Sequence, residues 1–223
     1  MPFRSRPAFV HEYERAVVDE GACWRDVELL ALDFEATGLD LEEDDVISFG
    51  SVLIRNGRMI AGEQRYELLK PTKPIPGQSS VVHRIRNQDL ERAQDPGVAA
   101  RELIGLLAGR VLVAHAAWVE VAFLRRLLRL HRAKLLAPVI DTAALSRALG
   151  LAPRIAQREP DLEALAERLG LPVHDPHHAL GDAITTAQVF LVLANRLERE
   201  QLGEALDIAT LANLTRLYPL LHP

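Results

Sequence analysis

The chain has 223 residues, of which 48% are hydrophobic and 26% are charged, so it is long enough to bury the core of one α/β domain. The formal net charge of −5 disfavours a broad basic surface for nucleic acid. The single cysteine, Cys23, excludes an internal disulfide and favours a cytoplasmic setting, and we find neither a secretory signal nor an apolar run of membrane-spanning length.

The first half of the chain predicts three consecutive strands after a polar extension over residues 1–26, which carries a short helix near His11–Val18. Asn56-Gly57 is typical of a tight hairpin, and the prolines of Pro71–Gly77 predict a loop. Short connections favour an antiparallel meander. The predicted strands are Val27–Glu35, Val46–Ile54 and Met59–Leu69.

The second half alternates helices with short strands, so the later strands join the sheet in parallel through helical crossovers. The fold class is therefore α/β, with a mixed central sheet of three antiparallel strands plus parallel strands, flanked by helices. We expect a main domain over 27–199 and a C-terminal helical tail over 200–223. The predicted helices are Pro96–Ala108, Trp118–Lys134 (with Leu130 on its buried side), Thr142–Leu149, Asp161–Leu169 and Leu180–Glu198, and the strands are Val111–Ala114 and Pro138–Ile140.

Two carboxylates mark the end of the first predicted strand. Side chains alternate along a strand, so Asp33 and Glu35 project from one face while Phe34 points into the core. Hard divalent cations bind such paired oxygen ligands. A solvent-facing acidic pair is the alternative, because this short pattern is common.

A further carboxylate, Asp182, opens the last predicted helix, and His177 precedes it by five residues. This spacing fits one metal ligand and one proton acceptor, because a free imidazole titrates near neutral pH. His178 is the alternative to His177. Glu120 lies early in the helix that follows a short strand, where it either joins this site or only stabilises the helix N-terminus.

Taken together, these segments resemble the DEDDh family of 3′–5′ exonucleases, the proofreading epsilon-subunit type, on a ribonuclease-H-like fold. The resemblance rests on Asp33-Phe34-Glu35-Ala36-Thr37-Gly38 and on His177-His178-Ala179-Leu180-Gly181-Asp182, which fits the pattern His-x-Ala-x-x-Asp. It extends over about residues 27–195. Weaker matches are Val82-His83-Arg84-Ile85, Val139-Ile140-Asp141-Thr142 and Leu162–Gly170.

The middle motif of the family differs in this chain. Where the family usually has His-Asn-Ala-x-Phe-Asp, this sequence has His115-Ala116-Ala117-Trp118-Val119-Glu120. The longer acid keeps its charge and both oxygens, but it can shift the second metal, favour Mn²⁺ over Mg²⁺ or slow the enzyme, because Mg²⁺ demands strict octahedral geometry. Trp118 either stacks on a base or belongs to the core, and we favour the core.

The resemblance implies two divalent cations, Mg²⁺ or Mn²⁺, and release of nucleoside 5′-monophosphates. Asp33, Glu35 and Asp182 would hold one cation, and Asp33 would bridge to the second, which Glu120 contacts through water. His177 would accept the proton of the attacking water, and Glu35 would accept a hydrogen bond from the terminal 3′-hydroxyl. The implied substrate-binding residues are Phe34, Thr37, Gly38, His83, Arg84, His115 and Trp118.

Basic residues are the remaining candidates for contacts with a nucleic-acid backbone. Arg84 and Arg86 lie near the substrate-side segment of the family. A second group on the helix after Trp118 either steers a strand or forms a solvated helix face, and we weigh these two interpretations evenly. Its members are Arg125, Arg126, Arg129, Arg132 and Lys134.

Three functions remain open from the sequence. The first is a 3′–5′ exonuclease that acts on DNA 3′ ends, single-stranded or frayed, and the second is an exoribonuclease of the same family. The third is a catalytically impaired nucleic-acid-binding or polymerase-associated module, which the change at Glu120 motivates; a purely structural cation site is a weaker possibility. The expected partners are a DNA or RNA 3′ end and a DNA polymerase or another replication or repair protein, with no membrane.

Overall fold

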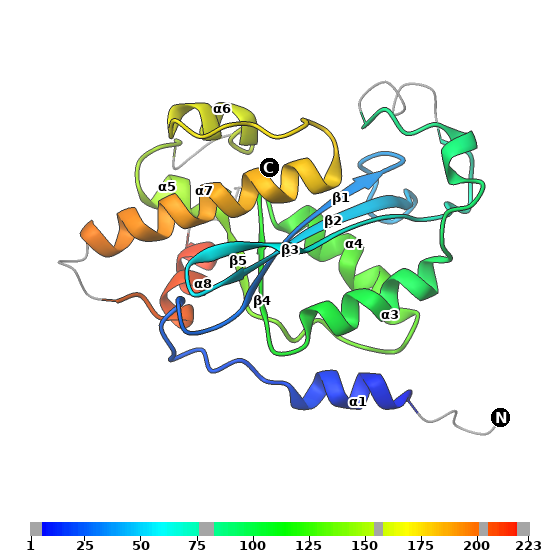
Figure 1. Cartoon of the computed structure of the whole chain (residues 1–223), viewed down its shortest axis with the longest axis horizontal. Coiled ribbons are helices and arrows are strands. Elements are labelled where there is room, and N and C mark those ends of the chain that lie inside the picture. The colour runs from blue at the N-terminus through cyan, green and yellow to red at the C-terminus, as the bar shows by residue number, and fades with distance from the viewer. Residues whose placement is uncertain (1–5, 76–82, 154–157, 201–204, 218–223) are drawn as a thin grey trace.

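A five-stranded mixed sheet forms the centre of the molecule (Figure 1), in the order β3-β2-β1-β4-β5. The computed structural model describes residues 6–75, 83–153, 158–200 and 205–217. The strands are β1 (Leu29–Ala36), β2 (Val46–Arg55), β3 (Arg58–Leu68), β4 (Val111–Ala114) and β5 (Val139–Asp141). The helices are α1 (Ala8–Arg15), η1 (Asn87–Leu90), α3 (Pro96–Leu107), α4 (Trp118–Arg129), α5 (Thr142–Ala148), α6 (Leu162–Arg168), α7 (Ala179–Glu200) and α8 (Ile208–Leu217).

The sheet has the predicted division into antiparallel and parallel strands. β1, β2 and β3 pair in antiparallel fashion, while β4 pairs in parallel with both β1 and β5. Asn56 and Gly57 have φ angles of 52° and 67°. Two successive positive φ angles are those of a type I′ turn, which joins β2 to β3 as the hairpin signal predicted.

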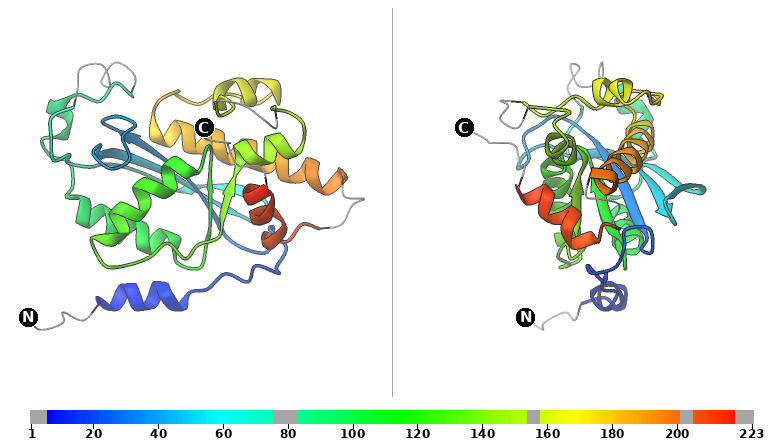
Figure 2. Two further views of the ribbon diagram at one scale, coloured as in Figure 1. Left: turned by 180° about the vertical axis from the view of Figure 1, so that it is seen from behind. Right: turned by 90° about the vertical axis from the view of Figure 1, so that its left-hand side faces the viewer.

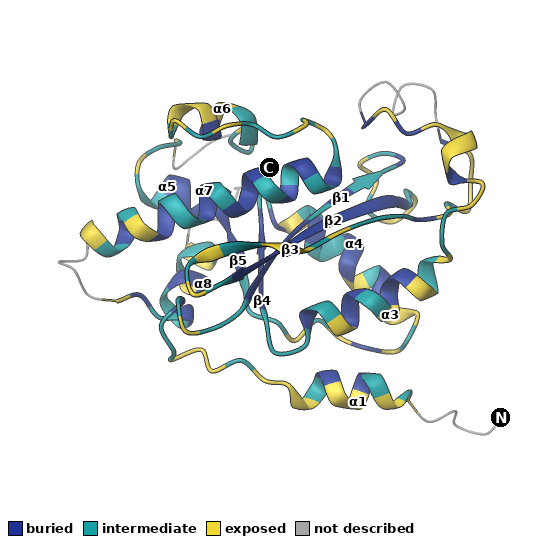
Figure 3. Cartoon of the chain, in the orientation of Figure 1, coloured by how far each residue is buried: buried dark blue, intermediate teal, exposed yellow. Residues whose placement is uncertain are grey.

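Alternation along β1 assigns its side chains to two separate cores. Leu29 and Ala31 pack in the core that α7 covers, whereas Leu30 and Leu32 pack in the core beneath α3 and α4. The views in Figure 2 place α7 on one face of the sheet and the two other helices on the opposite face. Figure 3 shows that β2 and the first part of β1 are buried between them.

The segments at the two ends of the described chain pack on the central domain. The backbone N–H of Trp24 donates to the carbonyl of Leu206, and Cys23 forms an isolated antiparallel bridge with Asp207. The hydroxyl of Tyr13, on α1, accepts a hydrogen bond from the N–H of Leu136 at 2.8 Å. Both terminal segments thus contribute buried residues. Their separation from a main domain, as extensions over 1–26 and 200–223, stays a prediction.

Several predicted boundaries were wrong. The helix from Trp118 ends at Arg129 rather than Lys134, because the chain turns and Arg132 has a φ of 59°, which a continuing helix does not allow. Leu130 lies past this end, and it is 56% exposed instead of buried. The first helix runs from Ala8, directly after Pro7, to Arg15. It therefore starts and ends earlier than the predicted His11–Val18.

Parts of two predicted features, the end of the Pro71–Gly77 loop and Val82 in the segment before α3, lie outside the described residues. Within the described part of the chain, no helix is long and apolar enough to cross a membrane.

Candidate functional site

Asp33 and Glu35 lie at the C-terminal end of β1, on the face that α7 covers. This placement follows from alternation, because Phe34 between them packs into the opposite core beneath α3 and α4. The same-face prediction from the sequence is thus confirmed. Both acids are partly buried, since the helix lies directly above the strand.

Asp182 reaches these acids because the first turn of α7 approaches β2 very closely. Gly50 pairs with Asp33 across the sheet, and a Cβ atom at Gly50 would lie 2.2 Å from the backbone of Ala179 and Leu180. Gly181 shows the same closeness on the helix, where a Cβ atom would lie 2.3 Å from the carbonyl oxygen of His174. Glycine at both positions is therefore what brings the helix N-terminus over the acidic strand end.

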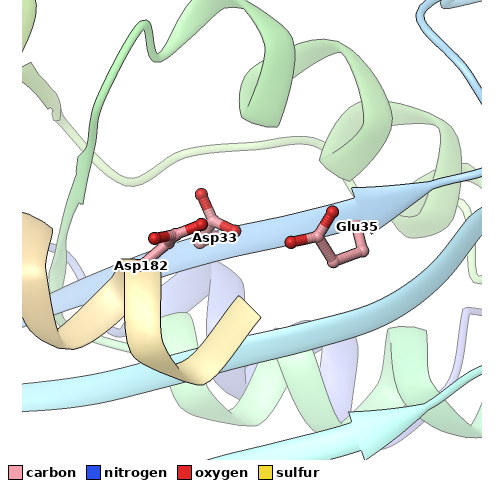
Figure 4. A group of neighbouring side chains, drawn as sticks. All are labelled: Asp33, Glu35 and Asp182. Atoms are coloured by element: carbon pink, nitrogen blue, oxygen red, sulfur yellow. The ribbon is translucent and has the colours of Figure 1, made fainter. Parts of the chain in front are cut away.

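The three acids form one compact group (Figure 4). Asp33 and Glu35 on β1 and Asp182 on α7 each offer one carboxylate oxygen, and these oxygens lie within 4.8 Å of one another. Within the described part of the chain, no lysine or arginine forms an ion pair with any of them. Such a group of oxygen ligands suits a hard divalent cation.

The acids hold their protons more tightly than usual. Burial raises the pKa of Asp33 well above its ordinary range, and the carboxyl groups of Glu120, Asp182 and Glu35 add to this effect. Burial, together with Asp182, raises the pKa of Glu35 to about 7. Burial also raises the pKa of Asp182 to about 6, against the hydrogen bond that it accepts from the backbone of His177. Mutual repulsion and desolvation both disfavour ionisation here unless a cation is present.

Glu120, in the first turn of α4, is the fourth acid of the site. It is 5% exposed, and its Oε2 has no hydrogen-bond partner. Burial raises its pKa well above the usual range, and the carboxyl groups of Asp141 and Glu35 raise it further. An unpartnered buried carboxylate oxygen beside other carboxylates is costly, and a cation would satisfy it. The residues present therefore fit the binding of divalent cations.

The two candidate histidines have different environments. The backbone N–H of His177 donates to Oδ2 of Asp182 at 3.1 Å, while its imidazole Nε2 lies 3.7 Å from Oε1 of Glu163 on α6. His177 also has a φ of 59°. The ring of His178 stacks on Tyr66 of β3, with centroids 4.2 Å apart. His177 is thus the more accessible of the two, with its side chain 57% exposed.

A cavity of about 270 Å³ adjoins the acidic group. It combines apolar walls with the carboxyl group of Glu35. His83 contributes a buried imidazole whose Nδ1 accepts a hydrogen bond from the N–H of Ile85, and whose Nε2 has no partner. Burial lowers the pKa of His83, so its ring is neutral at physiological pH. The lining residues are Phe34, Glu35, Ala36, Gly38, Leu39, His83, Val119 and Phe123.

The turn after β1 is fixed by Asp44. Oγ1 of Thr37 donates to Oδ1 of Asp44 at 2.8 Å, and Thr37 is 7% exposed. A Cβ atom at Gly38 would lie 2.4 Å from Oδ2 of the same aspartate, so a larger residue there would displace the carboxylate that Thr37 contacts. Thr37 thus shapes the turn, whereas Gly38 borders the cavity directly.

Three other predicted substrate residues have contacts with groups of the protein itself. The imidazole of His115 lies between Oγ1 of Thr142, at 2.8 Å from Nδ1, and the carbonyl of Pro160, at 2.6 Å from Nε2. Nε1 of Trp118 donates to Glu159, and the side chain is 41% exposed, so our preference for a core position was wrong. Glu159, in the loop before α6, holds the indole at the surface.

Arg84, the last predicted substrate residue, contacts Asp175 at 3.4 Å. Its neighbour Arg86 pairs with Asp89 at the start of η1. Gly50, Glu163 and Tyr66 were missed by the sequence reasoning. A glycine inside a buried strand is a known sign of close backbone approach, so Gly50 had a detectable signal. The contacts of Glu163 and Tyr66 had no such signal in the sequence.

Comparisons with known proteins give a consistent result. A family model described as "Exonuclease" matches residues 30–190. The PolC-type DNA polymerase III of Thermotoga petrophila is 32% identical over 186 residues, which make up 82% of this chain and 13% of that protein. The DNA polymerase III subunit epsilon of Treponema pallidum is 32% identical over 169 residues, covering 75% of this chain and 76% of the subunit. The chain thus spans a small fraction of the PolC-type relative.

The solved structures agree on the fold. E. coli exonuclease I in complex with a dT13 oligonucleotide has a TM-score of 0.67 to this chain at 16% sequence identity, covering 78% of this chain and 42% of that one. The likeness confirms the predicted ribonuclease-H-like arrangement of a mixed sheet between helices.

Proposed function

The chain belongs to the DnaQ-like 3′–5′ exonuclease family, and from this premise we propose that it hydrolyses nucleic-acid 3′ ends to nucleoside 5′-monophosphates in a metal-dependent reaction. The observation that carries this proposal is the convergence of Asp33, Glu35 and Asp182 within 4.8 Å. The buried, unpartnered oxygen of Glu120 adds a fourth acid that needs a positive charge.

Two divalent cations, Mg²⁺ or Mn²⁺, are part of the proposal. Asp33, Glu35 and Asp182 would bind one of them. Asp33 would also bind the other, which Glu120 would contact through water. When bound, the cations would supply Lewis-acid activation of a water molecule and neutralise charge on the scissile phosphate. The raised pKa of each acid supports this assignment, because the group lacks the positive charge that would stabilise its ionised form.

The chain's own residues would position the substrate and move the proton. Glu35 would accept a hydrogen bond from the terminal 3′-hydroxyl, with the terminal nucleotide against Phe34, Gly38 and His83 in the adjoining cavity. Hydrolysis adds the oxygen of water to phosphorus and breaks the bond to the 3′-oxygen. His177 would accept the proton of that water, while the leaving oxygen takes a proton from solvent. The imidazole would first turn from Glu163 toward the acids.

DNA is the substrate that we favour, because the relatives at 32% identity are DNA polymerase III proteins. The structural relative that was solved with dT13 is consistent with this choice. A DNA polymerase or another replication or repair protein is the corresponding partner. A cytoplasmic setting, which the single Cys23 favours, stays a prediction. Contacts of Thr37, Arg84, His115 and Trp118 with substrate also stay predictions.

The proposal is tested with a 5′-labelled single-stranded DNA and its RNA counterpart, each with Mg²⁺, with Mn²⁺ and with chelator. We expect a ladder that shortens from the 3′ end, depends on metal and forms faster on DNA. Asp33→Asn, which keeps the shape of the side chain, should lower the rate on the order of a thousandfold.

A faster ladder on RNA would replace DNA by RNA as the substrate while keeping the reaction. The impaired-module interpretation makes the opposite prediction: intact substrate with every metal, although the folded protein still binds the strand. Burial of Glu120 beside the other acids speaks against that interpretation, because the carboxylate is retained at the site.

A further inference from the structure

The five basic residues on and after α4 do not form one uniform cluster. Arg126 has a structural role, because its guanidinium donates hydrogen bonds to the carbonyls of Leu41 at 2.7 Å and Asp44 at 2.6 Å. It thereby fastens the turn after β1 to the helix. Arg125, Arg129 and Lys134 instead line a hollow of about 330 Å³ together with Ala133 and Leu135.

The three cations around this hollow have no partner within the described part of the chain. Arg125, Arg129 and Lys134 are all exposed, and none of them forms a hydrogen bond or an ion pair with a residue that the structure describes. Other arginines of this chain are paired, as Arg25 is with Glu198 and Arg147 with Glu159. In a chain of net charge −5, this hollow is a local concentration of uncompensated positive charge.

Helix geometry places the hollow away from the acidic centre. Arg125 and Arg129 follow Glu120 by five and nine residues, which corresponds to about 7.5 Å and about 13.5 Å along the axis. They also point about 140° and about 180° around the helix from Glu120, because each residue turns the helix by about 100°. The hollow therefore lies on the outer face of α4, whose inner face carries the buried Leu124 and Leu128.

We propose that this hollow binds the phosphate backbone of a nucleic-acid strand several nucleotides away from the end held at the acidic centre. The inference rests on the proposed function for the class of ligand, and it adds a second contact site outside the catalytic group. Arg125 and Arg129 are separated by about 6 Å of helix rise, so a ligand that contacts both must carry negative charge over a distance of that order, as consecutive phosphates of a strand do. A chain of phosphates thus matches the spacing better than a single anion does.

The length of strand needed follows from the same geometry. The strand must cover about 13.5 Å along α4 and also pass around the helix, so it needs several nucleotides to reach from the acidic centre to the hollow. A dinucleotide would therefore occupy the acidic centre without reaching the hollow, whereas a 20-nucleotide strand would contact both. Length dependence distinguishes this site from the cavity beside Glu35.

The test measures binding rather than cleavage, in the full chain with Asp33→Asn and chelator present. Arg125→Gln with Arg129→Gln is compared with Arg58→Gln plus Arg199→Gln, which also removes two exposed positive charges but on β3 and α7. At low salt, the protein with Arg125→Gln and Arg129→Gln should bind the 20-nucleotide strand about tenfold more weakly than the protein with neither pair. The control pair should not weaken this binding. The slope of log K against log[salt] should decrease by about 1.4, since each phosphate contact on a single strand contributes about 0.7. Dinucleotide binding, followed by NMR titration, should be equal in both pairs.

Equal affinity of the two pairs for the 20-nucleotide strand would overturn the inference. A loss of dinucleotide binding in the first pair as large as its loss of 20-nucleotide binding would also overturn it. An arm with inorganic pyrophosphate separates a free anion from a strand: pyrophosphate binding that is lost in the first pair, with strand binding unchanged, would also overturn it. If no metal supports cleavage by the unmodified protein while the 20-nucleotide strand still depends on Arg125 and Arg129, the proposed function fails and the binding site stands.

Discussion

The two ends of the central strand β1 hold carboxylates in opposite electrostatic environments. Just before the strand, Glu28 accepts hydrogen bonds from Nε of Arg55 at 2.6 Å and from Nε of Arg110 at 2.7 Å. At the other end, Asp33 and Glu35 face Asp182 with no arginine or lysine paired to them among the described residues. The same side-chain chemistry thus stabilises the fold at one end and forms a site at the other.

The pKa shifts express this contrast. Partial burial raises the pKa of Glu28, but hydrogen bonds from Arg55 and Arg110 outweigh it, and the net shift is downward. Burial raises the pKa of Glu35 to about 7, and the neighbouring Asp182 raises it as well. A carboxylate whose charge is already neutralised has little need of a cation. Carboxylates that are gathered without such compensation indicate where a cation from solution is expected.

The largest effect that would sharpen this comparison comes from separating the acids physically. Gly50→Ala would place a methyl group 2.2 Å from the backbone of Ala179 and Leu180, so the start of α7 and Asp182 must move. We expect about a hundredfold loss of exonuclease rate, because displacements of about 1 Å have such effects. Overpacking should also cost about 1–3 kcal/mol of stability.

Gly62→Ala is the matched control, because a Cβ atom at Gly62, on β3, has nothing within 4 Å. Rates and thermal unfolding are measured for both variants. Full activity of a folded Gly50→Ala protein would show that the closeness of α7 to β2 does not set the position of Asp182.

A smaller effect concerns the length of the acid on α4. Glu120→Asp restores the residue typical of the family, and we expect the ratio of Mg²⁺-supported to Mn²⁺-supported rate to rise by about threefold to tenfold, because Mg²⁺ is strict about octahedral geometry. Glu120→Gln keeps the size but removes the charge, so it should slow the reaction with both metals. An unchanged metal ratio in Glu120→Asp would mean that the longer arm is accommodated without cost.

The pH dependence of stability should differ between the two ends of the strand. Glu35 ionises at about pH 7 in the folded protein and near about 4.3 when unfolded. Between these values the folded state binds more protons, so the free energy of unfolding falls as pH rises without metal. Glu28 has the opposite sign, because its lowered pKa gives stability above about pH 4.3 that is lost as pH falls through its folded value.

Thermal unfolding with chelator at pH 5.5 and pH 8 measures the Glu35 contribution. Glu35→Gln should lose less stability over this range than the unmodified protein does. Saturating divalent cation at pH 8 should raise the melting temperature of the unmodified protein, since it binds the folded state. Identical losses in the two proteins would show that Glu35 is not the group responsible.

The smallest effect is expected at the compensated end. Glu28→Gln should cost no more than about 1 kcal/mol, because the pair with Arg55 and Arg110 is partly exposed to solvent, and the exonuclease rate should not change. Glu43→Gln, at a pair with Lys73 whose side chains are 72% and 70% exposed, is the reference for a negligible effect. A drop in rate for Glu28→Gln would mean that the two ends of β1 are not independent.

Local patterns predicted much of this molecule. The alternation of Asp33, Phe34 and Glu35 fixed the face of each side chain, because the period of a strand does not depend on distant contacts. The Asn56-Gly57 turn was equally local, since these residue types tolerate positive φ. The resemblance to a family then supplied the expectation that Asp182 joins the acids.

Other features depended on residues far apart in the chain. The polar atoms of His115 and Trp118 contact Pro160 and Glu159 in the loop before α6, contacts that the sequence did not predict. The imidazole of His177 lies by Glu163. None of these pairs has a periodic signal, because each joins side chains whose distance is set by how a helix docks on the sheet.

The sequence by itself therefore determined the strand faces, the hairpin and the mixed sheet, since short-range sterics and hydrophobic periodicity specify them, while the resemblance to a family supplied the expected acids. Only the tertiary structure decided that α7 approaches Gly50 closely enough to gather Asp182 with the strand acids, and that Arg125 and Arg129 meet Lys134 around one hollow while Arg126 does not. The physical reason is that these arrangements depend on packing distances between elements, which no local pattern of residues encodes.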